Sequence, residues 1–366
     1  MSENIGLYLH IPFCRSKCAY CDFYSGKASE KEYDIYITES IKKIAYWGSR
    51  TDRTVSSVYF GGGTPSILGT DRLCKLLSEV KNQFNIAKNA EITLEANPES
   101  GVSLDFERLL CAGFNRLSVG LQSSDEKELA ALGRIHSPGE AELTVKKAKE
   151  AGFCNISLDI MLGIPYQTKE SLQKTIEFCA GCGVQHISAY LLKIEEGTRF
   201  DKIKDSLSLP DEDEQAQLYL YAVEQLEAKG YKQYEISNFA APSFESRHNT
   251  LYWNCGEYIG IGPAAHSFFK GKRFHYERSK ESFYRNEIIT DGDGGDEEEF
   301  LMLSLRLKNG LSFEEYEKRF KKPFPSAVIK KIEYYAKMGL METDGKSAGF
   351  TPKGFLLSNS ILSEII

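Results

Sequence analysis

The sequence predicts an α/β protein: an open, partial barrel of six strand–helix units, followed by a small C-terminal α+β domain. Short apolar segments alternate with amphipathic helical segments over the first two-thirds of the 366 residues. Strands that alternate with helices form a parallel sheet with right-handed crossovers. Six units are too few for a closed eight-stranded barrel, so we expect a partial barrel, with a doubly wound sheet as the alternative.

The expected strands are apolar segments, and each is followed by a segment with helical spacing. The first helix begins at Ser29, a good capping residue. The predicted strands span residues 6–11, 55–60, 90–96, 116–121, 155–162 and 186–192. The predicted helices span residues 29–47, 70–84, 103–112, 125–132, 138–151, 169–179 and 211–229. In either architecture the ligand site lies at the C-terminal ends of the strands.

After residue 231 the alternation weakens, and residues 238–262 are rich in aromatic residues, Asn and Gly. The acidic run 291–299, DGDGGDEEE, predicts a surface loop or linker. Three helical segments and a hairpin then resemble a small winged-helix module; they span residues 300–308, 312–319, 326–338 and 340–352. We therefore predict a core, a connecting segment and a C-terminal domain, at residues 1–240, 241–290 and 291–366.

Composition and charge exclude several classes of protein. The hydrophobic fraction of 42% and the charged fraction of 27% are those of an ordinary globular protein. The N-terminus has no basic region before its short apolar run, and no apolar stretch approaches the roughly 18 residues of a membrane span. We therefore expect a cytoplasmic protein without an integral membrane segment. A net charge of -7, and equal numbers of basic and acidic residues after residue 295, argue against nucleic acid as a partner.

Three of the nine cysteines, Cys14, Cys18 and Cys21, fall within eight residues directly after the first predicted strand. Three thiolates on one loop can hold three irons of a four-iron cubane and leave the fourth iron open to a ligand. A structural zinc site or three unrelated thiols are the alternatives. Zinc would need a fourth ligand, and Cys179 with Cys182 would overfill the site, so we expect that pair to be packing or surface thiols.

Other special residues stand at the ends of the predicted strands. The run 61–65, GGGTP, follows the second strand, where glycines let the backbone approach a ligand closely. Glu95 and Asp159 lie in apolar strands, where a carboxylate needs a ligand or an ion pair. Gln122 and Arg134 follow the fourth strand. Pairing of these carboxylates with each other or with Arg134 is the alternative to ligand binding.

The segment LYLHIPFCRSKCAYCDF, together with GGGTP, resembles the radical S-adenosylmethionine (SAM) superfamily and, more narrowly, the oxygen-independent coproporphyrinogen III oxidase-like family. The resemblance covers essentially the whole chain. It implies a 4Fe–4S cluster on the three cysteines and SAM at the open iron, with a flavodoxin or ferredoxin as electron donor. It implies that Gly62, Gly63, Thr64 and Glu95 hold the methionine end and that Arg134 pairs with a carboxylate. It places Gln122 and Asp159 toward the ribose, Tyr8 and Tyr20 beside the cluster, and Tyr20 near the adenine.

Two features bear on the branch of this family. Coproporphyrinogen dehydrogenases carry a further cysteine two residues after the third one and a longer N-terminal arm, whereas this chain has Phe23 and only 13 residues before Cys14. The segment HNTLYW resembles the heme-binding HNxxYW motif of HemW-type heme chaperones. The resemblance implies that His248 binds heme iron, with Asn249, Tyr252 and Trp253 in the same motif. A hydrogen-bonded histidine beside two core aromatics is the alternative.

His266 and His275 are possible second ligands to heme, although nothing in their sequence context singles them out. The favoured hypothesis is a heme chaperone that passes heme to an acceptor such as a respiratory heme protein. Oxidative decarboxylation of coproporphyrinogen III is the main alternative, and a radical methyl or hydrogen transfer on an unknown substrate is the third. The sequence assigns no catalytic residue, and whether the chain is an enzyme stays open.

Overall fold

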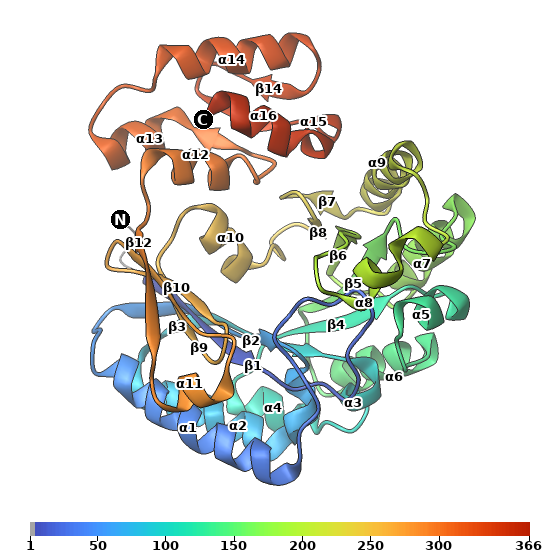
Figure 1. Cartoon of the computed structure of the whole chain (residues 1–366), viewed down its shortest axis with the longest axis vertical. Coiled ribbons are helices and arrows are strands. Elements are labelled where there is room, and N and C mark those ends of the chain that lie inside the picture. Colours follow the sequence, from blue (N-terminus) through green and yellow to red (C-terminus); the bar gives the residue numbers. More distant parts are fainter. Residues whose placement is uncertain (1–3) are drawn as a thin grey trace.

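The computed structural model describes residues 4–366, which form one large mixed sheet with helices on its outer side and a smaller C-terminal domain (Figure 1). The six central strands are β1 (Asn4–Ile11), β2 (Thr54–Gly62), β3 (Asn85–Ala96), β4 (Arg116–Gln122), β5 (Ile156–Leu162) and β6 (His186–Leu191). The helices of this part are α1 (Glu30–Gly48), α2 (Gly69–Gln83), α3 (Pro98–Gly101), α4 (Phe106–Ala112), α5 (Glu126–Leu132), α6 (Pro138–Glu150), α7 (Lys169–Gly181), α8 (Arg199–Ile203) and α9 (Glu212–Ala228), with short 3₁₀ turns at η1 (Pro65–Leu68) and η2 (Lys204–Ser206).

The six predicted strands all form, and they lie side by side in sequence order as a parallel sheet. A doubly wound sheet needs a point at which the strand order reverses. No such point occurs between β1 and β6, so the prediction of a partial barrel is confirmed and the doubly wound alternative is wrong.

Each strand has two faces with different surroundings, because successive side chains point to opposite sides of a sheet. One face packs against the outer helices, and the other faces the interior of the barrel. On β4, Leu117 and Val119 are buried against the outer helices, while Arg116 and Ser118 point inward. The inner face carries similar polar groups on the neighbouring strands: Ser57, Glu91, Glu95, Ser157, Asp159, His186 and Ser188. The barrel interior is therefore polar, which is typical of a binding site rather than of a packed core.

The local signals at the helix ends agree with this arrangement. Ser29 caps α1 and exchanges hydrogen bonds with Glu32 in a capping box, and Ser137 and Glu140 do the same for α6. The predicted first helix is thus confirmed to begin directly after Ser29. The predicted helix 103–112 is shorter than expected, because Asp105 caps α4 and the chain before it forms the separate turn α3.

The sheet continues beyond the predicted barrel on both sides. One extension contains β9 (Tyr258–Ile261), β10 (His266–Phe269), β11 (Lys272–Tyr276) and β12 (Ile288–Asp293), and the other contains β7 (Lys232–Gln233) and β8 (Asn238–Ala240). Strand β9 pairs with β1 in parallel, and the other added strands pair antiparallel, with helix α11 (Lys280–Tyr284) between β11 and β12. The second part of the predicted connecting segment 241–290 thus contributes strands to the main sheet.

The prediction of a surface loop over residues 291–299 is wrong at both ends. Residues 291–293 finish β12, where Arg273 and Lys272 of β11 pair with Gly292 and Asp293. Asp296 caps the next helix, α12 (Glu297–Ser304), and accepts from the Glu299 N–H. The acidic composition reflects a favourable first helical turn, since carboxylates stabilise a helix N-terminus.

Helix α10 (Arg247–Trp253), which contains the HNTLYW segment, packs against the inner side of the barrel. The Glu91 carboxylate of β3 accepts from the main-chain N–H groups of Arg247 (3.1 Å) and His248 (3.0 Å). A buried carboxylate at a helix N-terminus satisfies free N–H groups and interacts favourably with the helix dipole. Glu91 therefore fixes α10 to the sheet.

The C-terminal domain contains the predicted three helices and hairpin, together with two helices and a short strand that the sequence pattern did not predict. Its elements are α12, β13 (Leu311–Ser312), α13 (Phe313–Phe320), α14 (Ser326–Lys337), β14 (Met341–Thr343), β15 (Ser347–Phe350), α15 (Pro352–Leu356) and α16 (Ser358–Ile365). Main-chain hydrogen bonds join it to the barrel: the Ile236 N–H donates to the Arg306 carbonyl (3.0 Å), and the Lys308 N–H donates to the Tyr234 carbonyl (2.9 Å).

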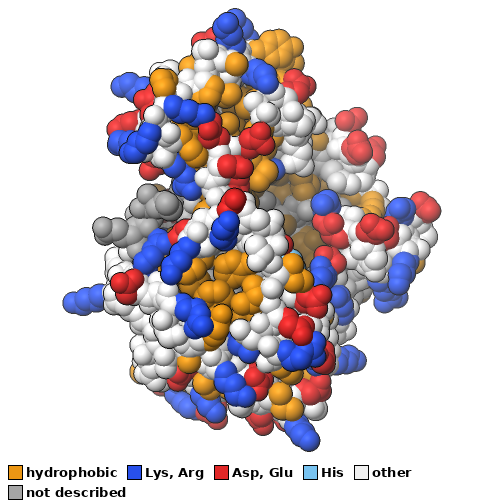
Figure 2. All heavy atoms as spheres, turned by 60° about the vertical axis from the view of Figure 1, so that its left-hand side comes forward, with side chains coloured by type: hydrophobic (Ala, Val, Ile, Leu, Met, Phe, Trp, Pro, Cys, Tyr) orange, Lys and Arg blue, Asp and Glu red, His pale blue; other side chains and the backbone are white. Residues whose placement is uncertain are grey.

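The face of the molecule in Figure 2 mixes basic and acidic side chains, with a patch of hydrophobic side chains near its middle. No large area of a single charge appears on this face, in keeping with the modest net charge of -7. Within residues 4–366, none of the helices has the length and apolar character needed to cross a bilayer.

Candidate functional site

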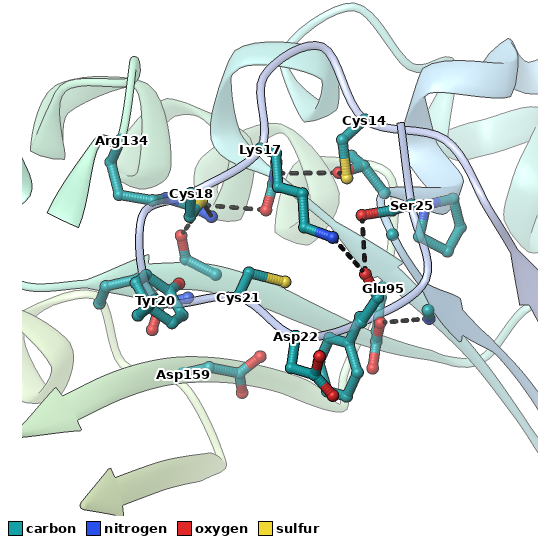
Figure 3. Close-up of a pocket in the computed structure, with 18 of the residues that line it drawn as sticks. Cys14, Lys17, Cys18, Tyr20, Cys21, Asp22, Ser25, Glu95, Arg134 and Asp159 are labelled. Atoms are coloured by element: carbon teal, nitrogen blue, oxygen red, sulfur yellow. Dashed lines mark hydrogen bonds between the residues drawn. The ribbon is translucent and has the colours of Figure 1, made fainter. Parts of the chain in front are cut away.

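The three predicted cysteines lie on the loop that follows β1 and line one cavity of about 570 Å³. Figure 3 shows their thiol groups turned toward the same space. The loop is fixed at several points: the Cys14 N–H donates to the Gly26 carbonyl (2.9 Å), and the Ala19 N–H donates to the Leu132 carbonyl (3.0 Å). The structure therefore brings together the three residues that the sequence singled out as metal ligands.

The GGGTP segment packs directly against this loop. The Gly63 N–H donates to the Ile11 carbonyl (2.8 Å), and the Thr64 N–H donates to the Phe13 carbonyl (2.7 Å). A Cβ on Gly63 would lie 2.6 Å from the Phe13 carbonyl oxygen, so no larger residue fits there. Thr64 Oγ1 lies 3.3 Å from Cys14 Sγ within hydrogen-bond distance. The segment thus supports the cysteine loop as well as lining the cavity.

Arg134 reaches the cavity from the loop after α5. Its guanidinium donates to Cys18 Sγ (3.5 Å), to Asn97 Oδ1 (2.9 Å) and to the Gly120 carbonyl (2.8 Å). Neither Glu95 nor Asp159 is among these partners. The alternative in which Arg134 forms an ion pair with one of these carboxylates is therefore wrong.

Glu95 lies at the C-terminal end of β3 on the wall of the cavity. The Tyr59 hydroxyl donates to one carboxylate oxygen (2.7 Å) and the Gly62 N–H donates to the other (3.2 Å). Burial raises the pKa of Glu95 to about 7, although both hydrogen bonds oppose the rise. A carboxylate in this state gains stability from a cationic ligand group, and no cationic side chain of residues 4–366 forms an ion pair with it.

The remaining predicted residues divide into two groups. Asp159, Gln122 and Tyr20 line the cavity, and Ser118 donates to both carboxylate oxygens of Asp159 (2.9 and 3.0 Å). Burial raises the pKa of Asp159 and that of Tyr20. Tyr8 does not line the cavity: its hydroxyl bonds His10 Nδ1 (3.0 Å) and its ring packs on Tyr59. Tyr59, on which the Tyr8 ring packs, is part of the cavity wall, and the position of Tyr8 beside the cluster stays a prediction.

The donor set of the cavity fits a cluster with three protein ligands. Burial raises the pKa of Cys14 and raises that of Cys21 to about 11, so a positive metal charge is needed to hold these thiols as thiolates. Among the residues that line the cavity, no fourth cysteine and no histidine is present. A closed structural zinc site, which needs four ligands, does not fit. Cys179 is buried in α7 and Cys182 ends that helix, away from this cavity.

The four predicted residues of the HNxxYW motif lie on α10, outside this cavity. The His248 ring is buried and stacks on Tyr59 with 5.1 Å between ring centroids. Its Nδ1 lies 2.9 Å from Ser57 Oγ and its Nε2 lies 2.7 Å from the Tyr252 hydroxyl. Burial lowers the pKa of His248 to about 3, so the ring is neutral. Both ring nitrogens are thus engaged, which is the arrangement of the hydrogen-bonded alternative.

His266 and His275 lie on β10 and β11, and neither lines the cavity. Sequence reasoning missed two residues that position the site, Tyr59 and Asn97. Asn97 joins the two sides of the cavity, because it donates to Thr64 Oγ1 (3.0 Å) and accepts from Arg134. The alternation of side chains along a strand could have identified both, because residues two apart lie on the same face. Tyr59 stands two residues before Gly61, and Asn97 stands two residues after Glu95.

Two family models match the chain: the radical SAM superfamily at residues 8–179 and the HemN C-terminal domain at residues 297–357. The heme chaperone HemW of Lactococcus lactis is 33% identical over 369 residues, which cover 98% of this chain and 96% of the relative. The heme chaperone HemW of Bacillus subtilis is 32% identical over 378 residues, which cover 98% of each chain.

Among solved structures, coproporphyrinogen III oxidase (HemN) of Escherichia coli matches with a TM-score of 0.83 and 21% identity, covering 99% of this chain and 89% of that one. That likeness establishes the shared fold. The radical SAM superfamily implies two cofactors, a 4Fe–4S cluster and SAM. The similarity to the curated relatives extends over nearly the full length of the chain, so the chain belongs to the HemW family within the radical SAM superfamily.

Proposed function

We propose that this chain is a heme chaperone: it binds heme through the HNxxYW segment and passes it to an acceptor protein. The observation that carries the proposal is the similarity over nearly the whole chain to proteins named heme chaperone HemW. Phe23, which is exposed, stands where coproporphyrinogen dehydrogenases have a further cysteine. This difference supports the chaperone over the decarboxylase.

The cavity side of the proposal assigns a ligand group to each polar residue. Cys14, Cys18 and Cys21 hold the cluster. Gly62, Gly63, Thr64 and Glu95 receive the methionine end of SAM, Arg134 pairs with its carboxylate, and Gln122 and Asp159 lie toward the ribose, with Tyr20 near the adenine. The contacts support the Glu95 role, since its half-buried carboxylate has no ion-pair partner among the described residues and can accept hydrogen bonds from the amino group of SAM. When bound and reduced, the cluster supplies the electron that cleaves the sulfonium of SAM.

The heme side of the proposal assigns the iron ligand to His248 Nε2. A ligating histidine must be neutral, and its other ring nitrogen normally donates to an oxygen that fixes the ring. His248 meets both conditions: its pKa is lowered to about 3 by burial, and Nδ1 lies 2.9 Å from Ser57 Oγ. The Tyr252 hydroxyl, 2.7 Å from Nε2, then stands where the iron would bind. Heme binding therefore requires the Tyr252 hydroxyl to move away from His248 Nε2. In this proposal, Asn249 and Trp253 of the same helix contact the porphyrin.

The proposal also includes the partners that the sequence indicated. A flavodoxin or ferredoxin reduces the cluster, and the protein acts in the cytoplasm, where reducing conditions keep thiols available for metal. All nine cysteines are free in the structure, as this setting requires.

Heme titration of the anaerobically reconstituted chain tests the proposal. The cluster-loaded wild type should bind one heme, and His248→Gln should bind none while it keeps the 4Fe–4S absorbance. His186→Gln is the matched control, because His186 is equally buried and has the same kinds of partner, Ser157 Oγ (2.8 Å) and the Tyr234 hydroxyl (2.8 Å). Heme binding that both variants retain, or that both lose, contradicts the role of His248.

The decarboxylase alternative has its own assay. Incubation of the cluster-loaded wild type with SAM, a reductant and coproporphyrinogen III should give no carbon dioxide above the rate of the cluster-free chain. Turnover of coproporphyrinogen would replace the chaperone proposal with the decarboxylase.

A further inference from the structure

Three side chains with metal-binding groups meet on the extension of the sheet, away from the cysteine cavity. They are His266 of β10, His275 of β11 and Asp291 of β12. His266 and His275 are opposite each other in the antiparallel register of β10 and β11, and Asp291 comes from the next strand along. Three neighbouring strands thus supply one ligand group each, and such a rigid support favours a defined site.

The three groups are close enough to share one ion. The His275 Nδ1 and the Asp291 carboxylate lie 2.9 Å apart, the His266 Nδ1 and the same carboxylate lie 3.9 Å apart, and the three donor atoms all fall within 4.8 Å of one another. The two imidazole rings stack with 4.8 Å between centroids. Metal–ligand bonds of about 2.0–2.2 Å require donor atoms to approach one another slightly, and the exposed His266 side chain is free to rotate.

Arg273 lies close enough to interact electrostatically with His266, but its charge is offset by an ion pair with Glu299, so it opposes a bound cation less than an unpaired arginine would.

We propose that His266, His275 and Asp291 form a binding site for a divalent transition metal ion, with Zn²⁺ as the occupant. Two imidazoles and one carboxylate suit zinc, whereas Ca²⁺ and Mg²⁺ prefer sites made of oxygen atoms. Three protein ligands leave the fourth position open to water or to a group of a partner, as in catalytic rather than structural zinc sites. The site is separate from the cluster and from His248, and it does not depend on the proposed heme function.

Zinc titration of the cluster-loaded full-length chain by calorimetry tests this site, because the cluster keeps the three cysteines from binding the added metal. The wild type should bind one Zn²⁺ at micromolar or lower concentration. His266→Ala, His275→Ala and Asp291→Asn should each weaken binding at least tenfold. Asp293→Asn is the matched control: it removes the same charge from the same strand at an exposed position, paired with Lys272, and should change the affinity less than twofold.

Cobalt absorbance distinguishes a built site from a weak surface contact. Bound Co²⁺ should give the visible bands of a four- or five-coordinate ion in the wild type and in Asp293→Asn, and the bands should be missing in the three site variants. Binding only at millimolar metal, or equal binding in all four variants, overturns the proposal. The 4Fe–4S absorbance of each variant serves as the check that the chain is folded.

Discussion

At the scale of single residues, the cavity wall contains two carboxylates that form no stabilising ion pair with a described residue of the cofactor-free protein. Glu95 is half-buried on β3 with a pKa raised to about 7, and Asp159 is half-buried beside three serines. Buried carboxylates without a cation cost free energy of folding, and proteins accept this cost mainly at functional sites. The predicted binding roles of these two residues agree with this pattern.

Glu95→Gln should stabilise the cofactor-free chain at pH 8 but not at pH 5. The folded pKa of Glu95 lies above the unfolded value, so the folded state holds the proton more tightly and loses stability as the pH rises from about 4.5 to about 7. The amide cannot ionise and still accepts from Tyr59, so we expect a gain of about 1–3 kcal/mol at pH 8. Denaturation midpoints at the two pH values measure it.

Glu95→Gln should also weaken SAM binding to the cluster-loaded chain, since it removes the negative charge that faces the amino group in our proposal. A gain of stability with unchanged SAM affinity would mean that Glu95 does not bind SAM. Equal effects on stability at pH 5 and pH 8 would mean that its ionisation is not the cause.

Arg134→Lys should make the cluster less persistent. An ammonium group cannot reproduce the fork that joins Cys18, Asn97 and the Gly120 carbonyl. We expect several-fold faster loss of iron to a chelator after reconstitution, followed by the decay of the cluster absorbance. Arg108→Lys, at an exposed ion pair with Asp71, should leave the rate unchanged, and equal rates in both variants would contradict the role of Arg134.

At the scale of single elements, α10 shows where sequence patterns stop being informative. Its seven residues are too few for a helical period to stand out, and its position depends on Glu91, which lies more than 150 residues away. The motif could be predicted from the letters HNTLYW, but the burial of His248 against Ser57 and Tyr59 could not. The added strands β7 to β12 were missed for a similar reason: several are only two to four residues long.

Glu91→Gln should loosen α10. It removes the charge that caps this helix and also faces the buried Arg116, whose Nε and Nη1 have no hydrogen-bond partner among the described residues. Loss of the Glu91 charge removes the largest favourable charge interaction of the buried Arg116, so the denaturation midpoint should fall clearly. Glu245→Gln, at an exposed residue just before the helix, is the control and should leave the midpoint unchanged.

At the scale of the whole molecule, the repeated strand–helix pattern made the barrel predictable, because β1 to β6 pair in chain order. The cysteine loop and the strand ends were predictable too, since parallel strands bring their C-terminal ends to one edge. The contact between the C-terminal domain and the barrel was not, because it rests on main-chain hydrogen bonds near Tyr234 and Arg306. Such bonds leave no side-chain signal in a sequence.

Gly310→Ala should destabilise that contact and the C-terminal domain together. Gly310 has a φ of +67°, and an added Cβ would lie 1.8 Å from the Ala348 carbonyl oxygen. Gly345 has a φ of +81° with open space around it, so Gly345→Ala adds backbone strain without the steric clash that Gly310→Ala causes. We expect a loss of about 1 kcal/mol for Gly345→Ala and of at least about 3 kcal/mol for Gly310→Ala in denaturation. Equal losses would show that close packing at Gly310 is unimportant.

The most direct test of the heme proposal is a comparison of heme affinity between wild type and Tyr252→Phe in the cluster-loaded chain. If heme iron takes the place of the Tyr252 hydroxyl at His248 Nε2, removal of that hydroxyl eliminates a competitor. Tyr252→Phe should then bind heme several-fold more tightly with an unchanged heme spectrum. Tyr258→Phe, whose ring packs on Tyr252 and whose hydroxyl accepts from Arg273, should bind like the wild type. Unchanged or weaker binding by Tyr252→Phe would contradict iron ligation by His248.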